Sequence, residues 1–172
     1  TTGPLSQGLA NGVGFAIAEQ ILNTKFGKNT IDHFTYVFAG DGCLMEGLSH
    51  EASSLAGHLG LSKLIVFFDD NAISIDGPTS LSVSEDTIKR YESYGWNTLT
   101  INGHDHDEIK TALEYTKISN VPSLIIGKTI MAKGTANREG DYETHGAPLH
   151  QEEIDETKED HLADHRFVGI HF

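Results

Sequence analysis

Apolar positions along the chain repeat with two periods that alternate. Residues 5–26 and 44–60 carry an apolar residue every three or four positions, which predicts helices with one buried face. Residues 34–40 and 63–70 are short, mostly apolar runs, and the second is apolar enough to predict a strand buried on both sides. The first part of the chain therefore predicts two helices and two strands in alternation.

Each predicted helix has a defined apolar face. In residues 5–26 this face consists of Leu5, Leu9, Val13, Ile17 and Ile21. In residues 44–60 it consists of Leu44, Leu48, Ala52, Leu55 and Leu59. The first helix is weakened locally by three glycines, which indicate close packing against another backbone: Gly8, Gly12 and Gly14.

The alternation continues through the second half of the chain. The predicted order is a turn-rich loop at 71–84, a helix at 85–95, a strand at 96–102, a helix at 105–119 capped by Asp105, and a strand at 122–130. Strands alternating with helices of this length predict parallel crossovers within one sheet. The expected fold class is therefore α/β, a parallel sheet with helices on both faces, whose ligands bind beyond the carboxyl ends of the strands.

Composition narrows the class of protein. The 172 residues, 38% hydrophobic and 22% charged, suit one globular domain with a substantial core. A net charge of −13 argues against nucleic acid as the main partner, because nucleic-acid-binding proteins display a basic patch. No segment has the pattern of a membrane span or a signal peptide, and the single Cys43 excludes an internal disulfide, which together favour a cytoplasmic location.

The stretch FAGDGCLMEG, residues 38–47, carries the strongest local signal. Gly40 and Gly42 flank Asp41 at the end of a predicted strand, where they let the backbone turn sharply and a ligand come close. Two familiar phosphate motifs are incomplete, since GVGFAI lacks the third glycine of the dinucleotide fingerprint and GKN lacks the features of a P-loop. Asp41 is thus a candidate metal-binding carboxylate, although alone it would more readily be a helix cap.

Asn71 ends the next predicted strand, one crossover after Asp41. Adjacent parallel strands would bring these two side-chain oxygens to the same edge of the sheet, and hard oxygen ligands suit Mg²⁺, which completes its shell with phosphate and water. The helix after Asp41 would point its N-terminus at the same edge and favour an anion. The pair therefore predicts Mg²⁺, or alternatively Ca²⁺ or Mn²⁺, holding a phosphate or diphosphate.

Several segments together resemble the transketolase family. GDGCLMEG followed by DDNAISIDG is similar to the thiamine diphosphate motif of transketolases. TTGPLSQGLANGVGFAIAE, SHEASSLAGHLGLSKLIVFFDDN and THGAPLH resemble further transketolase segments in the same order, so that the resemblance covers about residues 1–150. Related thiamine enzymes share the Gly-Asp-Gly and Asn positions, but not HEASSLAGHL or HGAPL.

The resemblance implies a role for each matching residue. The implied metal ligands are the side chains of Asp41 and Asn71 and the carbonyl of Ile73. The implied cofactor contacts are Gly42 at the diphosphate and, along the pyrimidine and thiazolium rings, Gly3, Pro4 and Leu5. His145, in HGAPL, is implied as a catalytic residue beside the thiazolium and the substrate, where an imidazole suits proton transfer near neutral pH.

Two acids complete the implied set. Glu46, as a catalytic residue, and Glu51 resemble the paired acids near the two-fold interface of these enzymes. Five positions apart on one helix they share a face imperfectly, so pairing with the acids of a partner chain is favoured. Without the resemblance, both would be interpreted as solvated helix residues and His145 as a loop histidine.

The remaining histidines and the cysteine have simpler interpretations. His104 and His106 belong to a turn and cap around Asp105, and Cys43 is a packed thiol at a helix start. The C-terminal histidines match no strong zinc spacing: His161, His165 and His171.

The implied function is that of the diphosphate-binding part of a transketolase. Such an enzyme transfers a two-carbon ketol unit from a ketose phosphate to an aldose phosphate in the pentose phosphate pathway. The glutamate that faces the aminopyrimidine belongs, in this family, to a pyrimidine-binding domain usually supplied by the partner subunit. The chain is therefore expected to form a homodimer and to be inactive alone. The alternatives are a component of a 2-oxo acid dehydrogenase and a non-catalytic assembly protein with the same fold.

The expected domain organisation has two parts. Residues 1–150 would form the domain that binds thiamine diphosphate and Mg²⁺, truncated at its N-terminus, because the chain starts at Thr1 rather than Met. Residues 151–172 would form an acidic, histidine-rich tail, either a peripheral helix or a loose end, to which the resemblance transfers no role.

Overall fold

The computed structural model describes residues 2–163, which fall into two compact units. The sheet unit comprises residues up to 70 together with 82–129, and the loop unit comprises 71–81 and the residues from 130 onward. The predicted boundary at residue 150 stays a prediction, since the compact units divide the chain at other positions. Among the described residues, no helix combines the length and the hydropathy needed to cross a bilayer.

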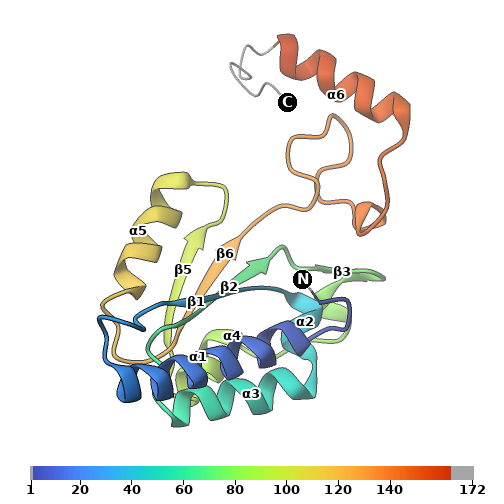
Figure 1. Ribbon diagram of the computed structural model, residues 1–172. Helices are drawn as coiled ribbons and strands as arrows, with labels where there is room; N and C mark the ends of the chain where they lie inside the picture. Colours follow the sequence, from blue (N-terminus) through green and yellow to red (C-terminus); the bar gives the residue numbers. More distant parts are fainter. Residues whose placement is uncertain (1, 164–172) are drawn as a thin grey trace. The chain divides into compact units, whose positions relative to one another are not determined.

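The sheet unit is built on four parallel strands. In sheet order they are β1 (Thr35–Gly40), β2 (Leu64–Asp70), β6 (Ser123–Lys128) and β5 (Asn97–Asn102) (Figure 1). The register places Gly40 opposite Asp69 and Asp70 opposite Lys128, so all carboxyl ends reach one edge. The two central strands are buried almost throughout, whereas β1 alternates between buried and exposed residues, as befits an edge strand.

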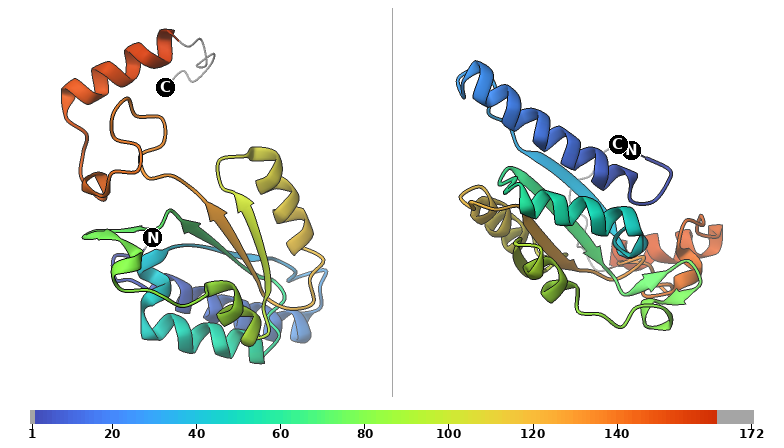
Figure 2. Two further views of the ribbon diagram at one scale, coloured as in Figure 1. Left: turned by 180° about the vertical axis from the view of Figure 1, so that it is seen from behind. Right: turned by 90° about the horizontal axis from the view of Figure 1, so that it is seen from below.

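Helices cover both faces of this sheet, which confirms the predicted fold class. One face is covered by α1 (Gln7–Phe26), α3 (Gly47–His58) and α4 (Thr87–Ser93), and the other by α5 (His106–Thr116) (Figures 1 and 2). The larger core lies under the three helices, where Val66 and Leu124 of the central strands meet Leu9, Ala56 and Trp96. A smaller core under α5 joins Ile65, Ile125 and Ala112. The alternation of periods in the sequence thus predicted both layers.

Most predicted elements are present with ends shifted by a few residues. Asp105 caps α5 as expected, because its carboxylate accepts hydrogen bonds from the backbone amides of Asp107 and Glu108 at 2.9 and 3.0 Å. Gly95 ends the helix before it with φ 86°, a conformation that favours glycine.

The helix predicted over 44–60 is wrong in its continuity. It divides into α2 (Asp41–Met45) and α3, because Glu46 between them is extended, with φ −70° and ψ 141°. The hydroxyl of Ser49, almost fully buried, donates a hydrogen bond back to the carbonyl of Cys43 and so joins the two helices across the break. A helical period across residues 44–60 could not reveal this break, because a single extended residue changes the direction of the axis and not the spacing of leucines.

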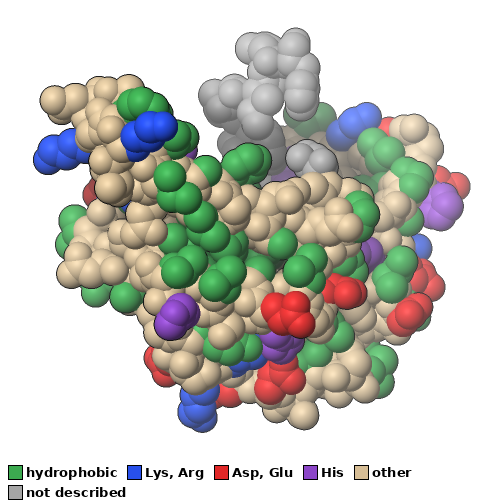
Figure 3. Space-filling model, turned by 60° about the horizontal axis from the view of Figure 1, so that its bottom comes forward, with side chains coloured by type: hydrophobic (Ala, Val, Ile, Leu, Met, Phe, Trp, Pro, Cys, Tyr) green, Lys and Arg blue, Asp and Glu red, His purple; other side chains and the backbone are tan. Residues whose placement is uncertain are grey.

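The predicted apolar faces were also only partly right. In α3 the buried residues are small, namely Ser49, Ala52, Ser53 and Ala56. Leu48, Leu55 and Leu59 are between 41% and 45% exposed. Hydrophobic side chains gather on the face of the molecule shown in Figure 3. In α1, Leu9 and Val13 are buried as predicted, while Ile21 is 60% exposed. The buried face of α3 therefore consists of small side chains, which allow close packing, and its leucines lie on the exposed face.

The loop unit has a different construction. Its elements are the antiparallel hairpin of β3 (Ile73–Ser74) and β4 (Gly77–Pro78), the short helices η1 (Thr79–Leu81) and η2 (Tyr142–Thr144), and α6 (Gln151–Ala163). The hairpin lies within the segment 71–84 that was predicted to be a loop. Every apolar residue that is fully buried within 2–163 belongs to the sheet unit, and the buried charged residue of the loop unit is Glu153. Polar contacts must therefore order this unit.

Gly12 and Gly14 of α1 give a matched test of helix packing. A Cβ added at Gly12 would lie 2.4 Å from Cγ2 of Val37, whereas one added at Gly14 would meet no atom within 4 Å. We expect Gly14→Ala to raise the free energy of unfolding by about 0.5–1 kcal/mol through helix propensity. Gly12→Ala should lower it by about 1–3 kcal/mol, because α1 must shift away from β1. Urea unfolding of both variants measures the difference, and equal effects would contradict this account of the packing.

Candidate functional site

The carboxyl edge of the sheet brings polar residues to the ends of β1 and β2. Asp41 directly follows β1 as the first residue of α2, and its side chain is half-buried. Asn71 directly follows β2, two residues beyond Asp69, which is paired with Gly40. β1 and β2 are adjacent and parallel, as the magnesium prediction required. Asp41 belongs to the sheet unit and Asn71 to the loop unit.

Within the sheet unit, the segment before α1 packs on the Gly-Asp-Gly turn. A Cβ built on Gly42 would meet Cδ1 of Leu5 at 3.4 Å, so the Leu5 side chain lies against this glycine. Pro4 and Leu5 line a cavity of about 410 Å³ that Cys43 and β1 also line. The structure thus brings Gly42 together with two of the three residues predicted to contact the cofactor rings, and Gly3 adjoins them in an exposed position.

Glu46 and Glu51 lie on opposite sides of the helix break. Glu46 is the N-cap of α3, and its backbone carbonyl accepts hydrogen bonds from the amides of Ser49 and His50 at 3.0 and 3.4 Å. Glu51 lies within α3, and both acids are exposed. The sequence predicted one continuous helix that carries both acids, and this prediction is wrong. Both side chains are accessible to solvent.

Within the loop unit, Asn71 and Ile73 are joined in one tight turn. The Oδ1 atom of Asn71 accepts a hydrogen bond from the backbone amide of Ile73 at 2.9 Å. Ala72 between them is left-handed, with φ 60°, and its carbonyl accepts a hydrogen bond from the amide of Thr79 at 3.0 Å. A left-handed alanine is strained by about 1 kcal/mol, and such strain concentrates at functional sites. The turn thus holds the side chain of Asn71 and the backbone of Ile73 in a defined relation.

His145 directly follows η2 as its C-cap, and this short helix packs against β4 of the hairpin that follows Asn71. The amide of His145 donates a hydrogen bond to the carbonyl of Tyr142 at 3.0 Å, and its side chain is exposed. The loop unit therefore brings the turn before His145 close to the hairpin that follows Asn71, although about 70 residues separate the two in the sequence.

The two acids at the end of β2 bond to residues at and directly after the end of the neighbouring strand β6. Asp69 accepts a hydrogen bond from the hydroxyl of Thr129, and Asp70 pairs with Lys128. The amide of Thr129 also donates to the carbonyl of Asp70 at 3.1 Å. The sequence analysis missed these contacts. Their signal was a pair of acids ending one strand and a Lys-Thr pair ending another, but only the strand order shows that β2 and β6 are adjacent.

The three predicted metal ligands share one donor chemistry. A carboxylate from Asp41, an amide oxygen from Asn71 and a backbone carbonyl from Ile73 are all oxygen ligands, the kind that Mg²⁺ takes. The hydrogen bond from the Ile73 amide uses one of the two lone pairs of the Asn71 oxygen, and the other lone pair is compatible with a metal.

The other histidines form no metal centre in the described part of the chain. Residues 2–163 contain no group of three or more His, Cys, Asp or Glu side chains arranged to hold a metal ion. His161 lies in α6, and its Nε2 is 2.7 Å from the carbonyl oxygen of Gly134. His165 and His171, named in the sequence analysis, lie outside the described residues.

Comparison with known proteins gives one consistent family. The model of the transketolase thiamine diphosphate-binding domain matches residues 1–168. Transketolase 1 of Aliivibrio fischeri is 56% identical over 162 residues, which are 92% of this chain and 24% of that protein. Transketolase 1 of Vibrio parahaemolyticus is 55% identical over 163 residues, with 92% and 24% covered. The chain thus spans about a quarter of the length of these curated relatives.

Solved structures agree with this family. The crystal structure of a Campylobacter jejuni transketolase superposes with a TM-score of 0.90 at 48% identity, covering 92% of this chain and 25% of that one. A Pichia stipitis transketolase in complex with sedoheptulose 7-phosphate gives a TM-score of 0.88 at 46% identity, covering 93% and 24%. Both identities are high enough for the likeness to extend from the fold to the family.

The strained turn at Ala72 gives a stability test. Because glycine adopts a left-handed conformation without steric cost, Ala72→Gly should raise the free energy of unfolding by about 0.5–1 kcal/mol, or leave it unchanged. The same change at the exposed Ala18 of α1 should lower it by about 1 kcal/mol, since glycine disfavours a helix interior. Urea denaturation of the two variants measures the contrast. Destabilisation by Ala72→Gly as large as by Ala18→Gly would contradict a strained turn.

Proposed function

Because this chain belongs to the transketolase family, through its thiamine diphosphate-binding domain, we propose that it holds the diphosphate end of that cofactor in a transketolase reaction. The reaction would transfer a two-carbon ketol unit from a ketose phosphate to an aldose phosphate. The observation that carries the proposal is the parallel pairing of β1 with β2, because Asp41 directly follows β1 and Asn71 directly follows β2. The complex of the Pichia stipitis relative with sedoheptulose 7-phosphate supports sugar phosphates as the substrate class.

The residues of this chain would divide the work of binding. Asp41, Asn71 and the carbonyl of Ile73 would hold Mg²⁺, with Ca²⁺ or Mn²⁺ as possible substitutes, and the ion would neutralise the diphosphate in a protein whose net charge is −13. Gly42, which has no side chain, would let the diphosphate approach the backbone. The cofactor rings would lie along Gly3, Pro4 and Leu5.

Catalysis would rest on the bound cofactor and on two side chains of this chain. Thiamine diphosphate, when bound, supplies a stabilised carbanion that allows a carbon–carbon bond beside a carbonyl to break and form again. His145 would contact the substrate and hold or release a proton at a ring nitrogen, which imidazole does near neutral pH. Glu46, exposed at the start of α3, would act together with the partner chain.

A homodimer and a pyrimidine-binding domain are the proposed partners. Leu48 and Leu55 of α3, with Leu59 directly after the helix, are exposed apolar residues, and Glu51 of α3 is exposed as well. Burying these leucines against a second copy would remove apolar surface from water at roughly 25 cal/mol per Å². The pyrimidine-binding domain would supply the glutamate that faces the aminopyrimidine. The pentose phosphate pathway and a cytoplasmic location fit this proposal.

The alternatives have less support. A component of a 2-oxo acid dehydrogenase and a non-catalytic assembly protein would both keep an α/β fold, but the similar proteins described above are transketolases. A donor assay that compares a ketose phosphate with a 2-oxo acid, with a pyrimidine-binding domain added, separates the two enzyme classes. Turnover of the 2-oxo acid alone would overturn the proposed reaction.

Native mass spectrometry tests the proposed cofactor site directly. With thiamine diphosphate and Mg²⁺ present, we expect a dimer that carries the cofactor, and no cofactor when Mg²⁺ is replaced by EDTA. Asp41→Ala should reduce the bound fraction at least about tenfold, since a carboxylate ligand is lost. Asp107→Ala, which removes the same charge from the exposed first turn of α5, should bind like the parent chain. Cofactor binding that is unaffected by Asp41→Ala would contradict the assigned site.

A further inference from the structure

We propose that Asp141, held by Arg138, is a positioning residue that sets the turn carrying His145. This inference rests on the proposed role of His145 beside the cofactor. Asp141 has no place in the Gly-Asp-Gly motif, and the sequence analysis gave it no role. It touches no reacting group itself and would act through the backbone of η2.

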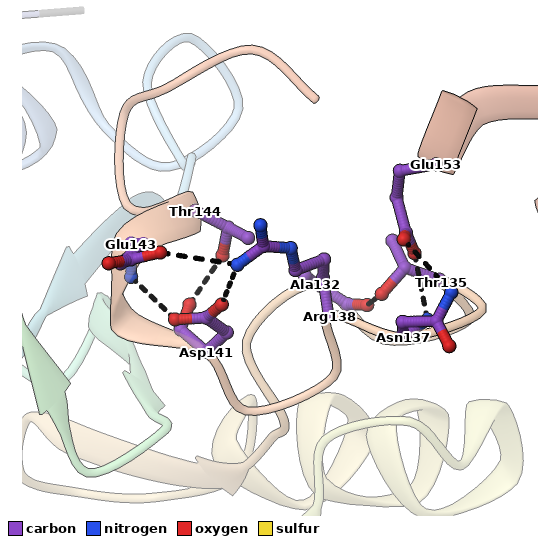
Figure 4. A network of polar contacts seen from close by, with 8 residues as sticks. All are labelled: Ala132, Thr135, Asn137, Arg138, Asp141, Glu143, Thr144 and Glu153. Atoms are coloured by element: carbon purple, nitrogen blue, oxygen red, sulfur yellow. Dashed lines mark hydrogen bonds and ion pairs between the residues drawn. The ribbon is translucent and has the colours of Figure 1, made fainter. Parts of the chain in front are cut away.

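Asp141 is the N-cap of η2, and its carboxylate bonds to the second residue of that helix. Its Oδ1 atom accepts a hydrogen bond from the backbone amide of Glu143 at 2.9 Å, which satisfies a donor that a helix start leaves without an internal partner (Figure 4). The backbone carbonyl of Asp141 accepts two more hydrogen bonds, from the hydroxyl of Thr144 at 2.7 Å and from its amide at 3.1 Å. Asp141 is therefore bonded to two of the three residues that precede His145.

Arg138 holds the second oxygen of the same carboxylate. Its guanidinium pairs with Oδ2 of Asp141 and also lies 3.2 Å from the carboxylate of Glu143 (Figure 4). The amide of Asp141 donates to the carbonyl of Arg138 at 3.2 Å, which closes the loop between the two residues. The orientation of the Asp141 carboxylate is thus fixed by contacts on both of its oxygens, one with Arg138 and one with η2.

The segment on the other side of Arg138 is anchored to α6. The backbone amide of Asn137 donates to Oε1 of Glu153 at 2.8 Å, and its side-chain amide lies 3.2 Å from Oε2 (Figure 4). The hydroxyl of Thr135 donates to the carbonyl of Ala132 at 2.9 Å. Arg138 therefore projects from a segment that is itself held in place, which lets it act as a fixed support for Asp141.

Polar contacts carry this task because the described part of the loop unit offers no apolar core. His145 is exposed, so the backbone of the turn before it sets the position of its Cα–Cβ bond, from which the ring projects. Gly146 after it is left-handed, with φ 71°, and the chain then leaves the turn. Loss of the Asp141 cap would release the start of η2 and with it the hydrogen bond between the amide of His145 and the carbonyl of Tyr142.

The charge state of the pair agrees with this geometry. The amide of Glu143, and next the guanidinium of Arg138, lower the pKa of Asp141 below its usual value. Because the folded pKa is lowered, the contribution of this carboxylate to the order of the turn is fully present above the unfolded pKa. It is lost as the pH falls through the lowered pKa. At neutral pH Asp141 is therefore ionised and able to cap the turn.

The test measures the turn and the cofactor site separately. In the full 172-residue chain without cofactor, NMR follows the exchange of the Thr144 and His145 amides with water in three variants. Asp141→Ala should speed this exchange on the order of fivefold, since the cap is lost. Asp141→Asn, which keeps an acceptor oxygen, should restore most of the protection. Asp160→Ala, an exposed acid in α6, serves as the control and should change nothing. Unchanged exchange in Asp141→Ala would overturn the proposal.

A second measurement, of the affinity for thiamine diphosphate with Mg²⁺ in the same variants, distinguishes a positioning role of Asp141 from an effect on the stability of the turn alone. Asp141→Ala should weaken binding and Asp141→Asn should recover it, with Asp160→Ala equal to the parent chain. Faster exchange with unchanged binding would overturn the positioning role. If the parent chain binds no cofactor, the proposed function fails, and the exchange measurement still decides whether Asp141 sets the turn of His145.

Discussion

The parallel pairing of β1 with β2 is the constraint on which the rest of the structure depends. Parallel neighbours must point their carboxyl ends to the same edge, and the register places Gly40 beside Asp69. The chain therefore leaves the sheet twice at that edge, once into Asp41 and once into Asn71. The buried side chains of β2 and β6 hold this register, because a slip by one residue would turn Val66 and Leu124 away from the larger core.

The sequence predicted the layers of the sheet unit, and it named the residues of the candidate site, whose roles stay a prediction. Helical and strand periods identified α1, β1, β2, α5 and β6, because each buries one continuous face or run. Asp41, Asn71 and His145 stood out through short motifs whose residues are neighbours in the chain. The structure supports the local relations that such motifs express, for example the bond from the Ile73 amide to Asn71.

What the sequence could not show depends on contacts between distant residues. The break at Glu46 needs the hydroxyl of Ser49 on the carbonyl of Cys43, and a leucine pattern does not encode it. The leucines of α3 point outward because small residues fit between the helices, which only tertiary packing reveals. Ala72 is left-handed although alanine rarely is, since the bond to Thr79 and the hairpin impose the turn.

The contrast between the two units also has a calorimetric consequence. Heat capacity changes on unfolding come mainly from apolar surface that becomes exposed, and the fully buried apolar residues of 2–163 lie in the sheet unit. Disorder of the segment around Arg138 and Asp141 would therefore be nearly silent in a scanning calorimeter. It would instead follow ionic strength, because exposed ion pairs are screened by salt. A thermal midpoint for this chain reports on the sheet and leaves the state of His145 unseen.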